Sequence, residues 1–180
     1  MKKARIIVTE KCNRNCEGCY NKDWKYEPPI ELEDFNILEE YDEIIITGGE
    51  PLLYPTQLQT FLSTLWKKDT LSEKKFYLYS ADCTKILELI DIITLLDGLT
   101  FTIHSEEDIK PFLQFNRILL FLKEEMLEDI SLRLYIFDNL QTKFPLIDLS
   151  LWKVKNVSWI KDCPLPEEET LFILKHPLNA

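Results

Sequence analysis

The chain has 180 residues, of which 46% are hydrophobic and 12% aromatic, so its composition favours a packed domain over a disordered segment. Its formal net charge of -10 argues against extended nucleic-acid binding, which relies on clustered lysine and arginine. No stretch approaches the roughly 20 apolar residues of a membrane-spanning helix, and the first residues lack the apolar run of a secretory signal, so we expect one cytoplasmic domain over residues 1–180 without a membrane partner.

Short β-rich apolar segments alternate with segments of helical spacing along the chain. This alternation predicts an α/β fold with a mainly parallel sheet and right-handed crossovers. The expected strands are residues 4–9, 43–49, 74–80, 99–104, 132–138 and 156–161. The expected helices are residues 31–41, 56–68, 84–95 and 107–126.

Chain length limits how many βα units can form. A closed eight-stranded barrel typically uses about 250 residues, so 180 residues supply about six units and predict an open, partial (β/α)6 barrel. In such folds the functional residues lie at the carboxyl ends of the strands. Residues 163–180 contain three prolines and an acidic run, and we interpret them as a C-terminal extension over the barrel.

Three cysteines, Cys12, Cys16 and Cys19, follow the first expected strand within eight residues. An odd total of five cysteines without an export signal argues against a disulfide framework and favours a metal site. Structural zinc normally has four protein ligands, and cubane iron-sulfur clusters are ordinarily held by four cysteines. Three thiolates would leave one iron of such a cluster free, whereas a zinc site would need a fourth ligand such as Cys83, Cys163 or His104.

The second expected strand runs into the turn Gly48-Gly49-Glu50-Pro51. Two glycines allow the backbone to approach a ligand closely. The Glu50 carboxylate is an acceptor suited to a bound ammonium group. Taken by itself, this turn is more typical of a loop with a solvated glutamate than of a functional site.

A C-x-x-x-C-x-x-C loop after the first strand, followed by G-G-E-P after the second, resembles the radical S-adenosylmethionine (SAM) superfamily. The resemblance implies a 4Fe-4S cluster held by Cys12, Cys16 and Cys19, with SAM chelating the fourth iron. It also implies that residues 48–50 bind the amino group of SAM. Both motifs lie on a βα background that spans nearly the whole chain.

Further SAM contacts are expected at the mouth of the barrel. Many family members place a large residue before the third cysteine, where this chain has Gly18, so we expect Tyr20 either to pack on the adenine or to anchor the loop. Ser80, His104 and Ser105 follow later strands and are candidate contacts for the ribose and carboxylate. His104 is equally well explained as a cap of the following helix.

The resemblance implies that an external flavodoxin-like or ferredoxin-like donor reduces the cluster, and that cleavage of SAM gives a 5′-deoxyadenosyl radical. The radical would abstract hydrogen from a small-molecule, nucleoside or peptide substrate. A second hypothesis is an activating enzyme for a glycyl-radical protein such as anaerobic ribonucleotide reductase, because residues 19–24 resemble such activases, although Trp24 follows Asp23 without the expected threonine. A third is a non-enzymatic, metal-stabilised interaction domain that binds zinc.

Overall fold

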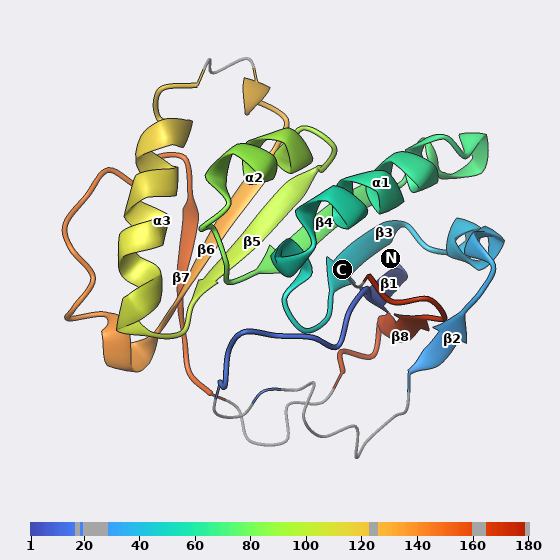
Figure 1. Cartoon of the computed structure of the whole chain (residues 1–180), viewed down its shortest axis with the longest axis horizontal. Helices are drawn as coiled ribbons and strands as arrows, with labels where there is room; N and C mark the ends of the chain where they lie inside the picture. Colours follow the sequence, from blue (N-terminus) through green and yellow to red (C-terminus); the bar gives the residue numbers. More distant parts are fainter. Residues whose placement is uncertain (17–18, 20–28, 123–125, 160–164, 179–180) are drawn as a thin grey trace.

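The computed structural model describes residues 1–16, 19, 29–122, 126–159 and 165–178. Its described strands form one open sheet in which every pair of neighbours is parallel, in the order β2-β8-β1-β3-β4-β5-β6-β7 (Figure 1). The strand bounds are β1 Lys3–Ile7, β2 Ile30–Leu32, β3 Glu43–Thr47, β4 Lys75–Ser80, β5 Gly98–Ile103, β6 Ser131–Phe137, β7 Lys153–Val157 and β8 Glu169–Leu174.

The six predicted strands correspond to the consecutive run β1-β3-β4-β5-β6-β7, which confirms an α/β fold with an open parallel sheet. Ile44, Ile45 and Ile46 of β3 are all buried, as expected for a β-branched strand near the middle of a parallel sheet. The last of the six begins earlier than predicted, at Lys153 rather than at residue 156.

Two predictions at the β1 side of the sheet are wrong. Part of the segment 163–180, expected as an extension over the barrel, instead forms β8 between β1 and β2, where Phe172 is fully buried opposite Ile6. The acidic run before β8 and the flanking prolines conceal this short strand in the sequence. Residues 31–41 do not form an α-helix, since they contain the end of β2 and a 3-10 helix, η2, at Phe35–Glu40.

Three α-helices, α1 (Pro55–Trp66), α2 (Ile86–Ile93) and α3 (Glu106–Leu119), lie on the same side of the sheet (Figure 1). Their apolar stripes pack against alternate strand residues to form the core; α1, for example, contributes Leu58 and Leu62. The third helix ends well before residue 126, where the prediction placed its end. None of the described helices has the length and apolar character needed to cross a bilayer.

Candidate functional site

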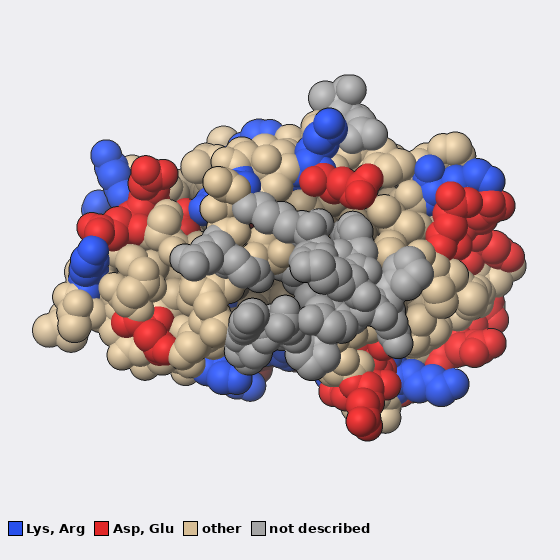
Figure 2. Space-filling view, turned by 90° about the horizontal axis from the view of Figure 1, so that it is seen from below, with Lys and Arg blue, Asp and Glu red and all other residues tan. Residues whose placement is uncertain are grey.

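A cavity of about 210 Å³ lies at the carboxyl ends of β1, β3, β4 and β5. It brings together the three cysteines, the Gly-Gly-Glu turn, Ser80 and His104, which the sequence analysis had placed on separate segments. Figure 2 views the molecule from the side of the cysteine loop, and the Lys, Arg, Asp and Glu side chains of the described residues visible on this face lie mainly around its edge. The lining residues are Cys12, Arg14, Cys16, Cys19, Thr47, Gly48, Gly49, Glu50, Tyr79, Ser80, Ala81, Thr102, His104 and Trp159.

The two glycines allow the loops after β1 and β3 to pack against each other. The Gly49 N–H donates to the Thr9 carbonyl at 2.6 Å, and the Glu50 N–H donates to the Lys11 carbonyl at 2.8 Å. A Cβ on Gly49 would lie 2.0 Å from the Lys11 oxygen, and one on Gly48, whose φ is +136°, would lie 2.4 Å from the Thr9 oxygen. The close approach predicted for a ligand is therefore made here by the backbone of the cysteine loop.

Glu50 is a buried carboxylate, only 2% exposed, and not the solvated turn residue of the alternative interpretation. Its Oε1 accepts hydrogen bonds from the Leu52 N–H at 3.0 Å and the Ser80 hydroxyl at 2.6 Å, and its Oε2 accepts from the Ala81 N–H at 3.0 Å. Burial raises the pKa of Glu50 to about 7. A carboxylate offers about four acceptor positions, and the donors among the described residues occupy three of them.

Arg14 and Asn13 connect the cysteine loop to the segment after β4 and to the first turn of α3. The Arg14 guanidinium forms an ion pair with Asp108 and donates to the Ala81 carbonyl. The Asn13 amide donates to the Asp82 carboxylate at 3.2 Å. This role has no local sequence signal, because the partners lie far along the chain and the loop itself shows only a cation between cysteines.

The three cysteines differ in exposure, Cys12 being exposed while Cys16 and Cys19 are partly buried. Burial raises the pKa of the Cys12 and Cys16 thiols. Cys83 is buried outside the cavity, and burial raises the pKa of its thiol strongly, as expected for a structural cysteine. Cys163 lies outside the described residues.

Among the described residues, no group of three His, Cys, Asp or Glu side chains is arranged so that it could hold one metal ion. The three thiols line one cavity without forming a finished ligand set. Cluster binding would therefore draw the thiolates of this loop together, as is common where metal binding and local folding are coupled.

His104 belongs to a cluster of three rings at the ends of β5, β6 and β7. Its ring centroid lies 5.4 Å from that of Trp159 and 5.1 Å from that of Phe137, and the Trp159 and Phe137 rings stack at 4.1 Å. Burial lowers the pKa of His104 to about 4, so the ring is neutral at pH 7. Its Nδ1 is buried without a partner among the residues described.

His104 also takes part in the start of α3, through its backbone. The Asp108 carboxylate accepts the N–H groups of His104 at 2.8 Å and Ser105 at 2.9 Å. Ser105 is the N-cap residue of α3 and does not line the cavity, so the structure does not place it with the other predicted contacts.

Trp159 also lines the cavity but was not predicted as a site residue. It follows β7, which ends at Val157, whereas the strand expected at residues 156–161 would have included it. Tyr20 and the activase-like residues 20–24 lie outside the described residues, and their predicted roles stay predictions.

Residues 4–117 match the model of a family described as a 4Fe-4S single cluster domain, and the match spans more than half of the chain. The chain belongs to this family. A comparison with curated proteins finds no match. The matched segment of this 4Fe-4S domain begins in β1, includes the three cysteines and the Gly-Gly-Glu turn, and ends within α3.

The donor set fits a 4Fe-4S cluster. Three cysteines line the cavity, whereas Cys83, the remaining described cysteine, lies outside it. Thiolates are the usual ligands of iron-sulfur clusters, and the candidate ligands here are Cys12, Cys16 and Cys19.

Proposed function

We propose that this 4Fe-4S protein is a radical SAM enzyme, with the cluster held by Cys12, Cys16 and Cys19 and SAM bound in the adjoining cavity. The observation that carries the proposal is the convergence of the cysteine loop and the Gly-Gly-Glu turn on one cavity at the carboxyl ends of parallel strands. When bound, a reduced 4Fe-4S cluster supplies the single electron that splits SAM into methionine and a 5′-deoxyadenosyl radical.

Glu50 is suited to receive the amino group of SAM. Its carboxylate is fixed by Leu52, Ser80 and Ala81, and these donors of the described chain leave about one acceptor position for the ammonium. A bound ammonium would favour the ionised form of this carboxyl group and offset the effect of burial on its pKa. Ser80 thus acts through Glu50, by orienting the carboxylate, and not as a direct contact of SAM.

The ring cluster of His104, Phe137 and Trp159 provides an apolar wall for the adenine of SAM. His104 and Trp159 both line the cavity, and they supply the aromatic surface that Gly18 does not. Because burial keeps the His104 pKa near 4, the ring is uncharged at neutral pH and does not repel the sulfonium of SAM.

In the proposed reaction the radical abstracts hydrogen from a small-molecule, nucleoside or peptide substrate, and a flavodoxin-like or ferredoxin-like protein supplies the electron in the cytoplasm. An activase for a glycyl-radical protein would use the same cavity. Because its sequence signature lies at residues 19–24, of which only Cys19 is described, no observation in the structure favours it over the first reaction.

Anaerobically reconstituted protein, reduced with dithionite and given SAM, is expected to release 5′-deoxyadenosine, measured by liquid chromatography. Cys16→Ala should abolish both the product and the iron-sulfur absorption, whereas Cys83→Ala, which removes a thiol outside the cavity, should retain both. A fully iron-loaded protein that makes no 5′-deoxyadenosine would refute the proposal. Firm zinc binding with no iron-sulfur cluster would instead favour the interaction domain.

A further inference from the structure

The sheet has a second face, which the three helices leave uncovered. All of α1, α2 and α3 lie on the opposite side (Figure 1), where the alternate strand residues form the apolar core. The uncovered face is continuous with the SAM cavity, since Tyr79 and Thr102 belong to both. Strand alternation therefore decides which side chains a substrate would meet beside the cavity.

The usual interior of a parallel barrel is filled by branched apolar side chains, as this face is at Ile7 of β1 and Ile45 of β3, but over β4 to β7 the face is polar. The register places Tyr79, Thr100 and Arg133 in one row across β4, β5 and β6. The next row contains Thr102 with Tyr135 and Lys155 across β5, β6 and β7. Burying polar groups costs stability unless they are satisfied, so a polar inner face is better explained by binding than by packing.

The cations of this face fall into two groups. On β1, Arg5 is neutralised by Glu169 of β8, with an Nε–Oε2 distance of 2.6 Å. On β6 and β7, no carboxylate of the described residues pairs with Arg133, with Lys153 beside it in the register, or with Lys155. Cations that lack a carboxylate partner among the described residues therefore lie together on β6 and β7, in a chain whose net charge is -10.

Aromatic rings lie beneath these cations. The Arg133 guanidinium carbon lies 4.8 Å from the Tyr77 ring centroid, and the Lys155 ammonium lies 5.7 Å from that of Tyr135. Gly98 separates Tyr77 from β6, and a Cβ there would lie 2.8 Å from the tyrosine ring. The Thr100 hydroxyl in the adjacent row is buried and has no hydrogen-bond partner within the described chain.

We propose that this face binds the substrate of the enzyme through an anionic phosphate or carboxylate group, which Arg133 and Lys155 neutralise, while the partly exposed rings of Tyr79 and Tyr135 contact its planar part. This assignment of substrate class rests on the proposed SAM-dependent function. Neighbouring strands are about 4.8 Å apart, so Lys155 lies roughly 10 Å from Thr102 at the cavity, a separation that a small molecule can span. The anionic group would then be held while another part of the molecule reaches the radical.

The probe is phenyl phosphate, which combines a planar ring with an anion, titrated into the reconstituted protein by calorimetry without SAM. Arg133→Gln is expected to raise its Kd about tenfold, and Lys155→Gln, at an exposed position on β7, by a smaller factor. Arg133→Lys should restore part of the affinity. The matched controls are Arg117→Gln on α3 and Lys67→Gln at the end of α1. Each removes one positive charge on the helix side of the sheet, and each should leave Kd unchanged.

Benzoate replaces phosphate with carboxylate in a second arm, and benzyl alcohol removes the charge in a third. Tighter binding of either anion than of benzyl alcohol, lost in Arg133→Gln, supports the anion site and shows which anion it prefers. Absence of phenyl phosphate binding, or equal Kd values in wild type and Arg133→Gln, would overturn the proposal. Because binding is measured without SAM, a protein that releases no 5′-deoxyadenosine still reports on this site.

Discussion

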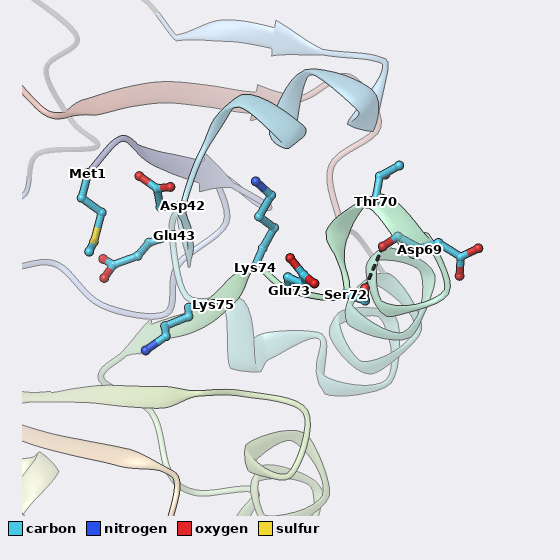
Figure 3. A pocket seen from close by; sticks show the side chains of 9 residues that line it. All are labelled: Met1, Asp42, Glu43, Asp69, Thr70, Ser72, Glu73, Lys74 and Lys75. Carbon is cyan, nitrogen blue, oxygen red and sulfur yellow. Dashed lines mark hydrogen bonds between the residues drawn. The ribbon is translucent and has the colours of Figure 1, made fainter.

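The two ends of the sheet carry cavities of different size and chemistry. The cavity at the amino ends of β3 and β4 has a volume of about 520 Å³, against about 210 Å³ at the carboxyl ends. Figure 3 shows the larger cavity, which is bordered by exposed side chains of both charge signs, including Asp42, Glu73 and Lys75. Ser72 also borders it, and its hydroxyl donates to the Asp69 carbonyl at 2.7 Å. The larger cavity contains no thiol among its lining residues.

The smaller cavity is the one lined by buried titratable groups with shifted pKa values. Its carboxylate, Glu50, and its imidazole, His104, have strongly shifted pKa values because both are buried. Perturbed titratable groups that gather in a cleft are typical of functional sites. The comparison indicates that buried, converging polar groups identify the site better than volume does, in keeping with the position of active sites at the carboxyl ends of parallel strands.

The largest expected effect concerns the packing of the two loops. Gly49→Ala should lower the free energy of unfolding by about 4 kcal/mol, because its Cβ would lie 2.0 Å from the Lys11 carbonyl oxygen and neither backbone can yield freely. Glu73→Ala, at the exposed cavity, should change it by less than about 0.5 kcal/mol. Urea denaturation of the two variants measures both; equal losses would contradict the difference between the two ends.

The pH dependence of stability tests the burial of His104. Its pKa is lowered from 6.5 to about 4 in the fold, so between these values the unfolded chain binds more protons and stability falls as the pH falls. Relative to His104→Phe, which keeps an aromatic ring beside Trp159, the wild type should lose about 2–3 kcal/mol between pH 7 and pH 4. Parallel stability curves for the two proteins would show that the imidazole is not buried as described.

Two ion pairs, one at the cavity and one on the surface, should differ in strength. Arg14→Gln leaves the buried Asp108 without its cation and should cost about 2 kcal/mol. Lys143→Gln breaks an exposed pair with Glu106 and should cost at most about 0.5 kcal/mol. Thermal unfolding of both variants provides the comparison, and a larger loss in Lys143→Gln would reverse the expected order.

The smallest effect concerns Ser80, which orients Glu50. Ser80→Ala removes the 2.6 Å hydrogen bond to the carboxylate and should cost about 1 kcal/mol. Ser72→Ala removes a hydroxyl at the other cavity, where water replaces the bond, and should cost less. Chemical denaturation at pH 8 measures both losses, and a Ser80→Ala variant as stable as the wild type would remove the support proposed for Glu50.

Much of the fold follows from local sequence patterns. Strands such as β3, with Ile44–Ile46, combine β-branched side chains with continuous burial and are detected from sequence alone. The β8 strand escaped prediction because it pairs with β1, more than 160 residues earlier in the chain, and its sequence offers only a short apolar run between acidic and proline-containing segments. Long-range pairing of this kind has no local signal.

In the candidate site, too, some residues can be recognised from a local sequence motif and others cannot. Cys12 and Glu50 stand in compact motifs whose spacing indicates their chemistry. Arg14, by contrast, acquires its role only through Asp108, which lies 94 residues along the chain, and Trp159 only through its packing on Phe137. Residues whose function depends on tertiary partners required the structure.

The most direct test of the central claim is whether SAM binds at the cysteine-loop cavity. Reduced protein with SAM isotopically labelled in its amino nitrogen can be measured by electron–nuclear double resonance. We expect a coupling between the labelled nitrogen and the cluster in the wild type and in the Glu73→Ala control at the opposite cavity. A fully iron-loaded protein that shows no such coupling at saturating SAM would contradict the account.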